Sequence, residues 1–292
     1  MRTAAEAGQA AALVLRAWGE PDKALSDLPE DLRPANLAHA YAIQQAVSRS
    51  LGAVGGWTIE TAGAPALLTC TPIPLAAIRR GPTHFAGRQW TLRRVEARIC
   101  VRIGSSLPDY DAPFGRDRVV AAIESCHAAL MVQQPRITDP GALDPLTSLA
   151  DSHGHACLVY GAHGSPWETV DLAGTQARML LGEKEVTART MQPNFDPVET
   201  LQWLANEGAR WGGGLLVGQL IAFAIGMREI HVPADTPARL VAAGLGEVSV
   251  HFAGDVLRAL PAAPRPWLHW ARLMSIMSRH RPHPSPCPVR HP

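Results

Sequence analysis

The chain has 292 residues, of which 47% are hydrophobic, so it is long enough for one large domain with a sizeable core or for a small domain attached to a larger one. Its 27 basic and 26 acidic residues give a formal net charge of +1, which argues against a chain-wide surface for nucleic acid or another acidic polymer. The five cysteines form no CxxC pair and no close cluster. This spacing disfavours both a disulfide framework and a structural zinc site, and we expect reduced, buried thiols.

The N-terminal region has no signal-peptide pattern, because the apolar run at residues 10–15 is short and is followed at once by Arg16. Nowhere does the sequence reach the roughly 20 uninterrupted apolar residues that a membrane-spanning helix needs. We therefore expect a cytoplasmic protein without a transmembrane segment.

Two helices are expected at the start of the chain. Residues 3–18 are rich in alanine, carry apolar positions at helical spacing and are stopped by the Gly-Glu-Pro sequence that follows. Residues 36–51 form a second amphipathic pattern that ends at three glycines. They predict an N-terminal helical lead-in region within residues 1–80.

A β-rich body follows over residues 81–262, where short apolar runs alternate with glycine and proline. Two helices are expected inside it, at residues 117–131 and from Asp196 to about residue 211, the second with an Asp cap and a proline at its first position. Strands are expected at residues 57–59, 95–103, 156–160, 218–224 and 247–252. Together these elements predict an α+β fold.

The stretch at residues 94–103 alternates strictly between apolar and polar positions, as a half-buried strand does. Glu96 and Arg98 are two residues apart, so both side chains project from the same face. They could present an acid and a fixed cation to a cleft. The alternative is an exposed strand face with a surface ion pair that contributes little.

Residues 263–292 differ from the body. An apolar helix around Trp267 and Trp270, surrounded by arginines, could dock on a partner or a membrane surface, or could cover an edge of its own domain. The proline-rich tail carries histidines and Cys287 that could chelate a metal, but the prolines favour a disordered tail.

Seven sequence blocks, in one colinear order over residues 36–252, resemble the hydratase/decarboxylase branch of the fumarylacetoacetate hydrolase superfamily. The resemblance implies a fumarylacetoacetase-like mixed β-sheet roll or barrel with an N-terminal helical layer. The blocks are Gly56-Trp57-Thr58-Ile59, Val95-Glu96-Ala97-Arg98-Ile99, residues 129–137 (ALMVQQPRI), residues 149–156 (LADSHGHA), residues 202–206 (QWLAN), residues 214–219 (GLLVGQ) and residues 244–248 (GLGEV).

The resemblance also implies a reaction and a metal. Members of this branch include 2-keto-4-pentenoate hydratases and 4-oxalocrotonate decarboxylases, which act on 2-oxo or 2-hydroxydienoic acids held on a divalent cation, usually magnesium. The implied ligand positions fall on Glu96, Arg98 and Met131. A guanidinium repels a cation and a thioether is a poor ligand for magnesium, so we expect no metal cofactor.

Other positions that the resemblance implies are also replaced. The family's lysine falls on Thr58 and the glycine after it on Glu60, while the acid of its Asp-Ser-Arg falls on Gln134 and leaves Arg136. The asparagine that usually follows Ala-Asp falls on Ser152.

Our hypothesis is that Arg98 takes the place of the metal, with Glu96 or Glu60 as general acid or base. The substrate-binding candidates are Thr58, Gln134, Arg136 and His153. For all of these residues a structural ion pair or core role is the alternative.

Two classes of function remain open. One is a metal-independent hydratase, decarboxylase or tautomerase acting on a small 2-oxo or enol carboxylic acid. The other is a non-catalytic member that binds a ligand or supports a partner. The resemblance implies a homo-oligomer, and nothing in the sequence indicates a nucleic-acid partner. A closed cluster of paired side chains would favour the second class, and an open concave site would favour the first.

Overall fold

A computed structural model of the chain describes residues 4–20, 23–62, 67–86, 90–138, 144–172, 174–191 and 196–254. They all belong to one compact unit, Met1–Asp255. The expected helix around Trp267 and the tail with Cys287 lie outside the described residues. Residue 80, after which the sequence predicted a boundary, lies inside this unit, and two strands that precede it pair with strands that follow it.

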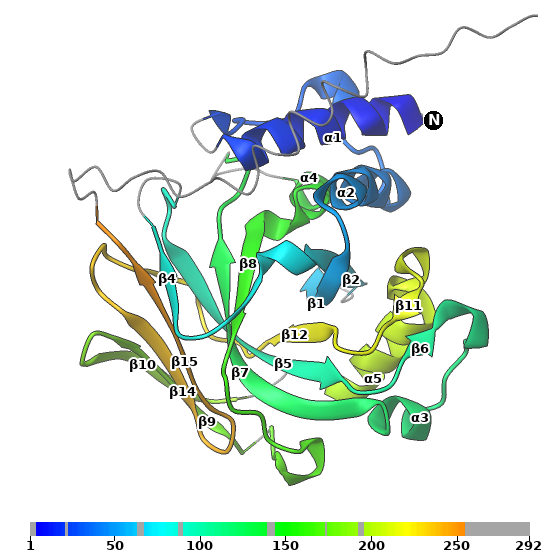
Figure 1. Cartoon of the computed structure of the whole chain (residues 1–292). Helices are drawn as coiled ribbons and strands as arrows, with labels where there is room; N and C mark the ends of the chain where they lie inside the picture. Colours follow the sequence, from blue (N-terminus) through cyan, green and yellow to red (C-terminus); the bar gives the residue numbers. More distant parts are fainter. Residues whose placement is uncertain are drawn as a thin grey trace, which may run out of the picture. The chain divides into compact units, whose positions relative to one another are not determined.

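The N-terminal helical layer contains α1 (Ala4–Gly19) and α2 (Leu37–Leu51), and α4 (Pro145–Ala150) packs against α2 (Figure 1). The side chain of Asn36 caps α2 by accepting a hydrogen bond from the backbone N–H of His39 at 2.9 Å. Val14 of α1 and Ile43 of α2 are fully buried in the core of this layer. Both predicted N-terminal helices are confirmed.

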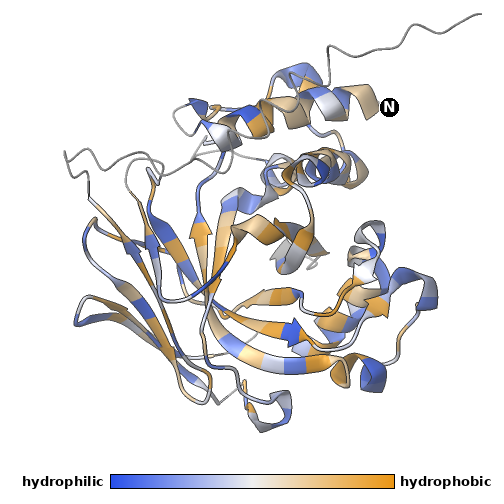
Figure 2. Ribbon diagram, viewed as in Figure 1, coloured by the Kyte–Doolittle hydropathy of each residue, from blue (hydrophilic) through white to orange (hydrophobic). Residues whose placement is uncertain are grey.

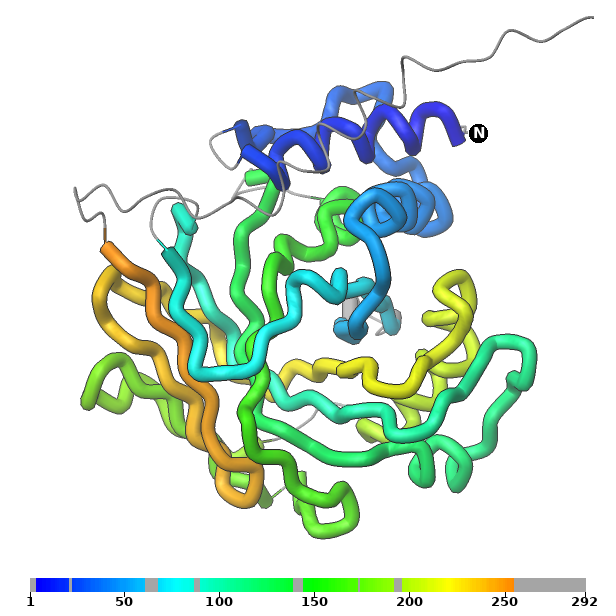
Figure 3. Tube along the Cα trace, viewed as in Figure 1, coloured from blue at the N-terminus to red at the C-terminus, as the bar shows by residue number. Residues whose placement is uncertain are grey.

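The largest of the three sheets among the described residues has eight strands. The tube in Figure 3 shows the chain leaving the blue helical layer to enter this sheet. The order is β2 (Leu67–Pro74), β1 (Val54–Ala62), β12 (Leu220–Ala224), β5 (Arg94–Ile103), β7 (Ile123–Gln133), β8 (His155–Tyr160) and β3 (Ile78–Arg80), with β13 (Ile230–His231) also paired to β5.

The second sheet has five strands and packs against one face of the first. Val95 and Ile99 of β5 share their buried cluster with Met179, Leu240 and Val250 of this sheet. Figure 2 shows apolar residues along the strands of both sheets. The order is β10 (Lys184–Thr190), β9 (Gln176–Leu181), β14 (Ala238–Ala242), β15 (Gly246–Phe252) and β4 (Thr83–Phe85), and β11 (Gly214–Leu215) pairs separately with β6 (Leu107–Pro108).

The remaining helices are short, and none of the described helices is long and apolar enough to cross a membrane. The predicted helix that starts at Asp196 is present, with the Asp196 side chain capping it, but it changes to π-helical geometry after about two turns. These elements are α3 (Arg116–Val120), α5 (Pro197–Trp203), the π-helical η8 (Leu204–Gly208), and the 3-10 turns η2 (Glu30–Leu32), η3 (Leu75–Ala77), η5 (Asp109–Asp111), η6 (Ser152–Gly154), η7 (Trp167–Thr169) and η9 (Arg210–Gly212).

The predicted helix over residues 117–131 is wrong. Only α3 is helical, and Ile123–Gln133 is the central strand β7. The residues from Cys126 to Val132 are buried on both faces of the sheet, so the strand shows no polar alternation. A continuous apolar run containing alanine, leucine and methionine is therefore compatible with either structure from sequence alone.

Candidate functional site

The two faces of β5 lie in different environments, one apolar and one polar, as the alternation of its sequence predicts. Val95, Ala97 and Ile99 face the core between the two sheets. Arg98 projects from the opposite face and is only 1% exposed. It lies opposite Ala129 on β7 and Ala224 on β12, and these small neighbours leave room for its guanidinium.

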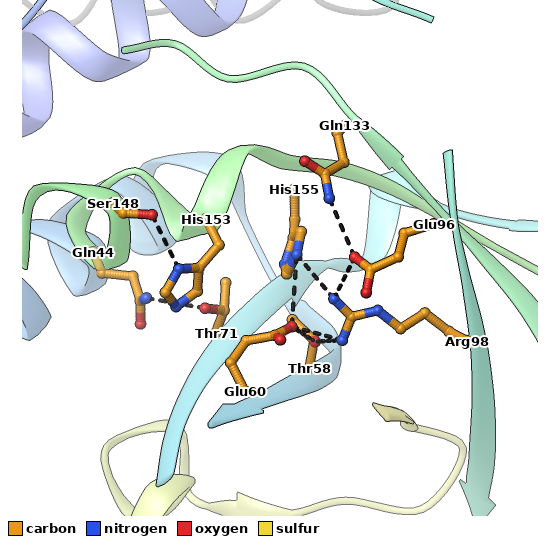
Figure 4. A network of polar contacts seen from close by, with 10 residues as sticks. All are labelled: Gln44, Thr58, Glu60, Thr71, Glu96, Arg98, Gln133, Ser148, His153 and His155. Carbon is orange, nitrogen blue, oxygen red and sulfur yellow. Dashed lines mark hydrogen bonds and ion pairs between the residues drawn. The ribbon is translucent and has the colours of Figure 1, made fainter. Parts of the chain in front are cut away.

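The Arg98 guanidinium lies between two carboxylates (Figure 4). Its Nη1 is 2.6 Å from Glu60 Oε1 and its Nη2 is 2.8 Å from Glu96 Oε2. Nη1 also donates to Thr58 Oγ1 at 3.1 Å, and that hydroxyl in turn donates to Glu60 Oε1 at 3.0 Å. The structure therefore brings together four residues that the sequence singled out. Thr58 and Glu60 lie on β1, and Glu96 and Arg98 lie on β5.

The two carboxylates form the more open side of the cluster. The side chain of Glu60 is 19% exposed and that of Glu96 is 16% exposed, in contrast to the fully covered guanidinium. Glu96 also accepts a hydrogen bond from Gln133 Nε2 at 3.2 Å. Burial raises the pKa of Glu96 above its ordinary value, and the Glu60 charge adds to this rise while Arg98 opposes it.

His155 belongs to the cluster, although the sequence gave no reason to assign it a role. It is 5% exposed, and its Nε2 lies 3.4 Å from Arg98 Nη2 and 3.7 Å from Glu60 Oε1. A guanidinium only donates hydrogen bonds, so Nε2 must accept and Nδ1 must carry the proton. Burial, together with the Arg98 charge, holds the pKa of His155 well below its usual range, and the ring is neutral at pH 7.

His153 lies beside this cluster, with its ring centroid 6.0 Å from that of His155. Its Nδ1 is 3.1 Å from Ser148 Oγ of α4. The side chain is half-buried, and burial lowers its pKa. The sequence named His153 as a candidate but gave no sign of its Ser148 partner.

Arg136 and Gln134 are not part of the cluster. Arg136 is 3% exposed and pairs with Asp151, whose Oδ1 is 2.7 Å from its Nε. The rest of its guanidinium donates to backbone oxygens and lies over the Trp18 ring at 4.1 Å. Gln134 donates to Thr91 Oγ1 at 2.7 Å. Both residues are therefore committed to holding backbone segments together.

The donor set does not fit a divalent cation. Met131 lies opposite Glu96 in the sheet but is fully buried in an apolar cluster, and Arg98 already pairs with both carboxylates. Among the described residues, no group of three His, Cys, Asp or Glu side chains could hold a metal. Next to Met131 and His155 there is a cavity of only about 10 Å³, enough for one water molecule.

Comparisons with known proteins establish the fold. No protein-family model and no curated protein sequence matches the chain. The structure of 4-oxalocrotonate decarboxylase from Pseudomonas putida G7 complexed with calcium and acetate matches with a TM-score of 0.71 and 19% identity, over 86% of this chain and 99% of that chain. The same enzyme complexed with magnesium and adipate matches with a TM-score of 0.71, 18% identity and the same coverage of 86% and 99%. The predicted fumarylacetoacetase-like α+β fold is confirmed.

Proposed function

We propose that the chain is a divergent member of the fumarylacetoacetate hydrolase superfamily and a metal-independent enzyme of the lyase or isomerase type. Its substrate is a small 2-oxo or enol carboxylic acid. The fold shared with a decarboxylase supports the class of reaction. The observation that carries the proposal is the buried guanidinium of Arg98 held between Glu60 and Glu96.

Arg98 is the fixed cation of the site rather than a free anchor for the substrate. Its Nη1 contacts Glu60 and Thr58, and its Nη2 contacts Glu96 and His155, so little donor capacity remains for a substrate carboxylate. It holds the Glu60 and Glu96 carboxylates close together. Burying the guanidinium costs desolvation free energy, and its attraction to the two carboxylates offsets this cost.

The two carboxylates supply the acid–base chemistry. Glu96, with its raised pKa, is the proton donor. Glu60 accepts two contacts at Oε1, from Arg98 and from Thr58, so its other oxygen is the proton acceptor. Carboxyl groups in different environments are a recurrent basis for dividing acid and base roles within one site.

A second candidate function is a non-catalytic subunit that binds a ligand or supports a partner. It is favoured by the closure of the cluster, since both Nη atoms of Arg98 are engaged and the adjacent cavity has room for no more than one water molecule. In this case the ion pairs stabilise the fold and carry no reaction.

A turnover and thermal-shift screen of the purified chain against 2-oxo and 2-hydroxydienoic acids, with EDTA and with added magnesium, tests the proposal. We expect turnover that survives EDTA and falls by about 10²–10⁴-fold in Glu60→Gln. Arg94→Lys, on the exposed end of the same strand, is the matched control and keeps full activity.

Two results would contradict the proposal. Turnover that requires magnesium would show that a metal still binds in a way the donor set does not indicate. Absence of turnover on every acid would favour the non-catalytic subunit, and stabilisation by one of the acids would identify its ligand.

A further inference from the structure

His153 stands on a strained turn. Ser152 and His153 have φ angles of 54° and 51°, and Gly154 follows with 74°, so three successive residues are left-handed. This conformation is uncommon for residues other than glycine, so the backbone is strained at Ser152 and His153. A Cβ at Gly154 would lie 3.1 Å from Pro135, so a side chain there would also be crowded.

The surrounding structure holds this turn in place. Asp151 Oδ2 accepts the backbone N–H groups of Arg136 at 2.8 Å and Ile137 at 3.1 Å. The backbone N–H of Gly154 donates to Asp151 O at 3.0 Å, and Gly154 O accepts from Gln134 N at 2.8 Å. The turn is thus fixed on both sides, and the strain is stored where His153 projects.

One nitrogen of His153 is engaged and the other is not. Nδ1 lies 3.1 Å from Ser148 Oγ, on a helix whose first turn is capped by Asp144. Nε2 is buried and has no hydrogen-bond partner among the described residues. In Figure 4 the ring is bonded to Ser148 and lies beside the Arg98 cluster, with its centroid 6.0 Å from that of His155.

A second buried atom without a partner lies in the same network. Gln44 is fully buried, and its Nε2 donates to Leu149 O at 3.0 Å and to Thr71 Oγ1 at 3.3 Å. A carbonyl oxygen only accepts, so the amide orientation is fixed and Oε1 is left without a donor among the described residues. Buried polar atoms nearly always have partners, so two such atoms without one, His153 Nε2 and Gln44 Oε1, point to a polar group from outside the chain.

We propose that His153 is a catalytic residue whose Nε2 takes the hydroxyl proton from the enol form of the substrate acid, with Ser148 as its positioning residue. This inference rests on the proposed function and names the form of the substrate that the site accepts. With Nδ1–H donating to Ser148 Oγ, Nε2 presents its lone pair to the enol hydroxyl.

The step is an enol-to-keto isomerisation. The O–H bond breaks and its proton moves to His153 Nε2, while the oxygen electron pair forms the C=O bond. The electron pair of the C=C bond forms a new C–H bond with the proton that Glu96 donates. Glu60, the proton acceptor of the proposed function, takes the proton from the imidazolium. Glu60 and Glu96 then return to their starting states by proton exchange with solvent.

The test compares His153→Asn with Glu60→Gln in the full chain, with 2-hydroxypenta-2,4-dienoate as substrate. Asparagine tolerates a left-handed backbone, so the turn is retained in this variant. We expect kcat to fall by about 10²–10⁴-fold in both variants. The exposed His163, replaced as His163→Asn, is the matched control with unchanged kcat.

Two further measurements separate a catalytic role from a structural one. Ser148→Ala should lower kcat by about tenfold, a smaller effect than removing the acid–base group itself, with KM and the melting temperature unchanged. Oxalate, a mimic of the enolate, should shift the His153 ring signals in nitrogen-15 NMR spectra of the full chain.

The outcomes distinguish the two proposals. Turnover that is lost in Glu60→Gln but retained in His153→Asn overturns the inference about His153 and leaves the proposed function standing. Unmoved His153 signals in the presence of oxalate, with unchanged kcat in His153→Asn, would mean that only ordered water fills the site. Absence of turnover in the unmodified chain overturns both.

Discussion

Arg98 carries its charge where solvent does not reach, so its partners determine the electrostatic balance around it. One cation faces two carboxylates that are each less than one-fifth exposed. Removing one member of such a buried group leaves the others without compensation, and this costs more than the intact group contributes.

Arg98→Met should therefore lower the free energy of unfolding by about 3–5 kcal/mol, because Glu60 and Glu96 would then repel each other in a poorly solvated place. Chemical denaturation followed by fluorescence measures this loss. Adding Glu60→Gln and Glu96→Gln to the same chain should restore most of it. Arg94→Met, which breaks an exposed pair with Glu229, should cost less than about 1 kcal/mol. Equal losses in the two arginine variants would contradict the account.

The raised pKa of Glu96 makes a separate prediction about pH. Because the folded-state pKa lies above the ordinary value of 4.5, this group stabilises the fold fully below pH 4.5. The contribution is lost as pH rises through the raised pKa. In Glu96→Gln the side chain does not titrate, so the variant has no such pH-dependent contribution to lose. Its Arg98 is paired with Glu60 alone. The melting temperature of Glu96→Gln, minus that of the parent chain, should therefore rise between pH 4.5 and pH 8. A difference that stays constant over this range would refute the prediction.

At the scale of elements, the Asp151–Arg136 pair joins α4, the left-handed turn and the segment after β7. Both side chains are almost fully buried, at 2% and 3% exposed. The stacking of Arg136 on Trp18 extends the connection to α1. This pair therefore fixes the helical layer to the sheet at the place where His153 projects.

Asp151→Asn should destabilise the chain by about 3–5 kcal/mol, because Arg136 would remain buried without its counter-charge. Hydrogen exchange should rise locally at residues 145–154, which α4 and the turn occupy. The control is Arg116→Ala, which breaks an exposed pair with Asp196 and should cost about 1 kcal/mol or less. Unchanged exchange in the turn would show that the pair does not hold it.

Sequence pattern predicted elements best where one face is buried and the other is polar. The two N-terminal helices and β5 have this pattern, and their bounds were predicted within a few residues. β7 lacks it, because both of its faces are covered. β9, β10 and β14 were not predicted, although β10 pairs with the neighbouring β9; only the pairing of β14 with β9 joins segments far apart in the sequence.

At the scale of the whole molecule, two buried histidines and the half-buried His153 make stability depend on pH. Burial is the main cause that lowers the pKa of His127, His153 and His155. The unfolded chain therefore takes up protons near pH 6.5 that the folded chain does not. The stabilising contribution is present above pH 6.5 and is lost as pH falls toward the lowered values.

The free energy of unfolding should accordingly fall between pH 7 and pH 5 by up to about 1.4 kcal/mol per pH unit for each proton taken up on unfolding, and the melting temperature should fall with it. Calorimetry across this range measures it. His127→Gln should reduce the slope, whereas the exposed His84→Gln should not. A flat profile would mean that these rings already accept protons in the folded chain.

The site was only partly predictable from sequence. The alternation of β5 placed Glu96 beside Arg98, and the ordered blocks placed Thr58 and Glu60 nearby, as the structure shows. The contribution of His155 depends on how β8 pairs with β7 across a register shift, and no local pattern reveals that pairing. The catalytic roles of Glu60, Glu96 and Arg98 remain predictions.

The position of Arg98 also bears on how the chain folds. Its contacts to Thr58 and His155 span 40 and 57 residues of sequence, so they form only after long loops have closed. If β5 paired one residue out of register, Arg98 and Glu96 would turn into the apolar core between the sheets, and Val95 and Ala97 would turn out of it. Misregistered sheets would therefore carry uncompensated buried charge, and the ion cluster selects the native strand alignment late in folding.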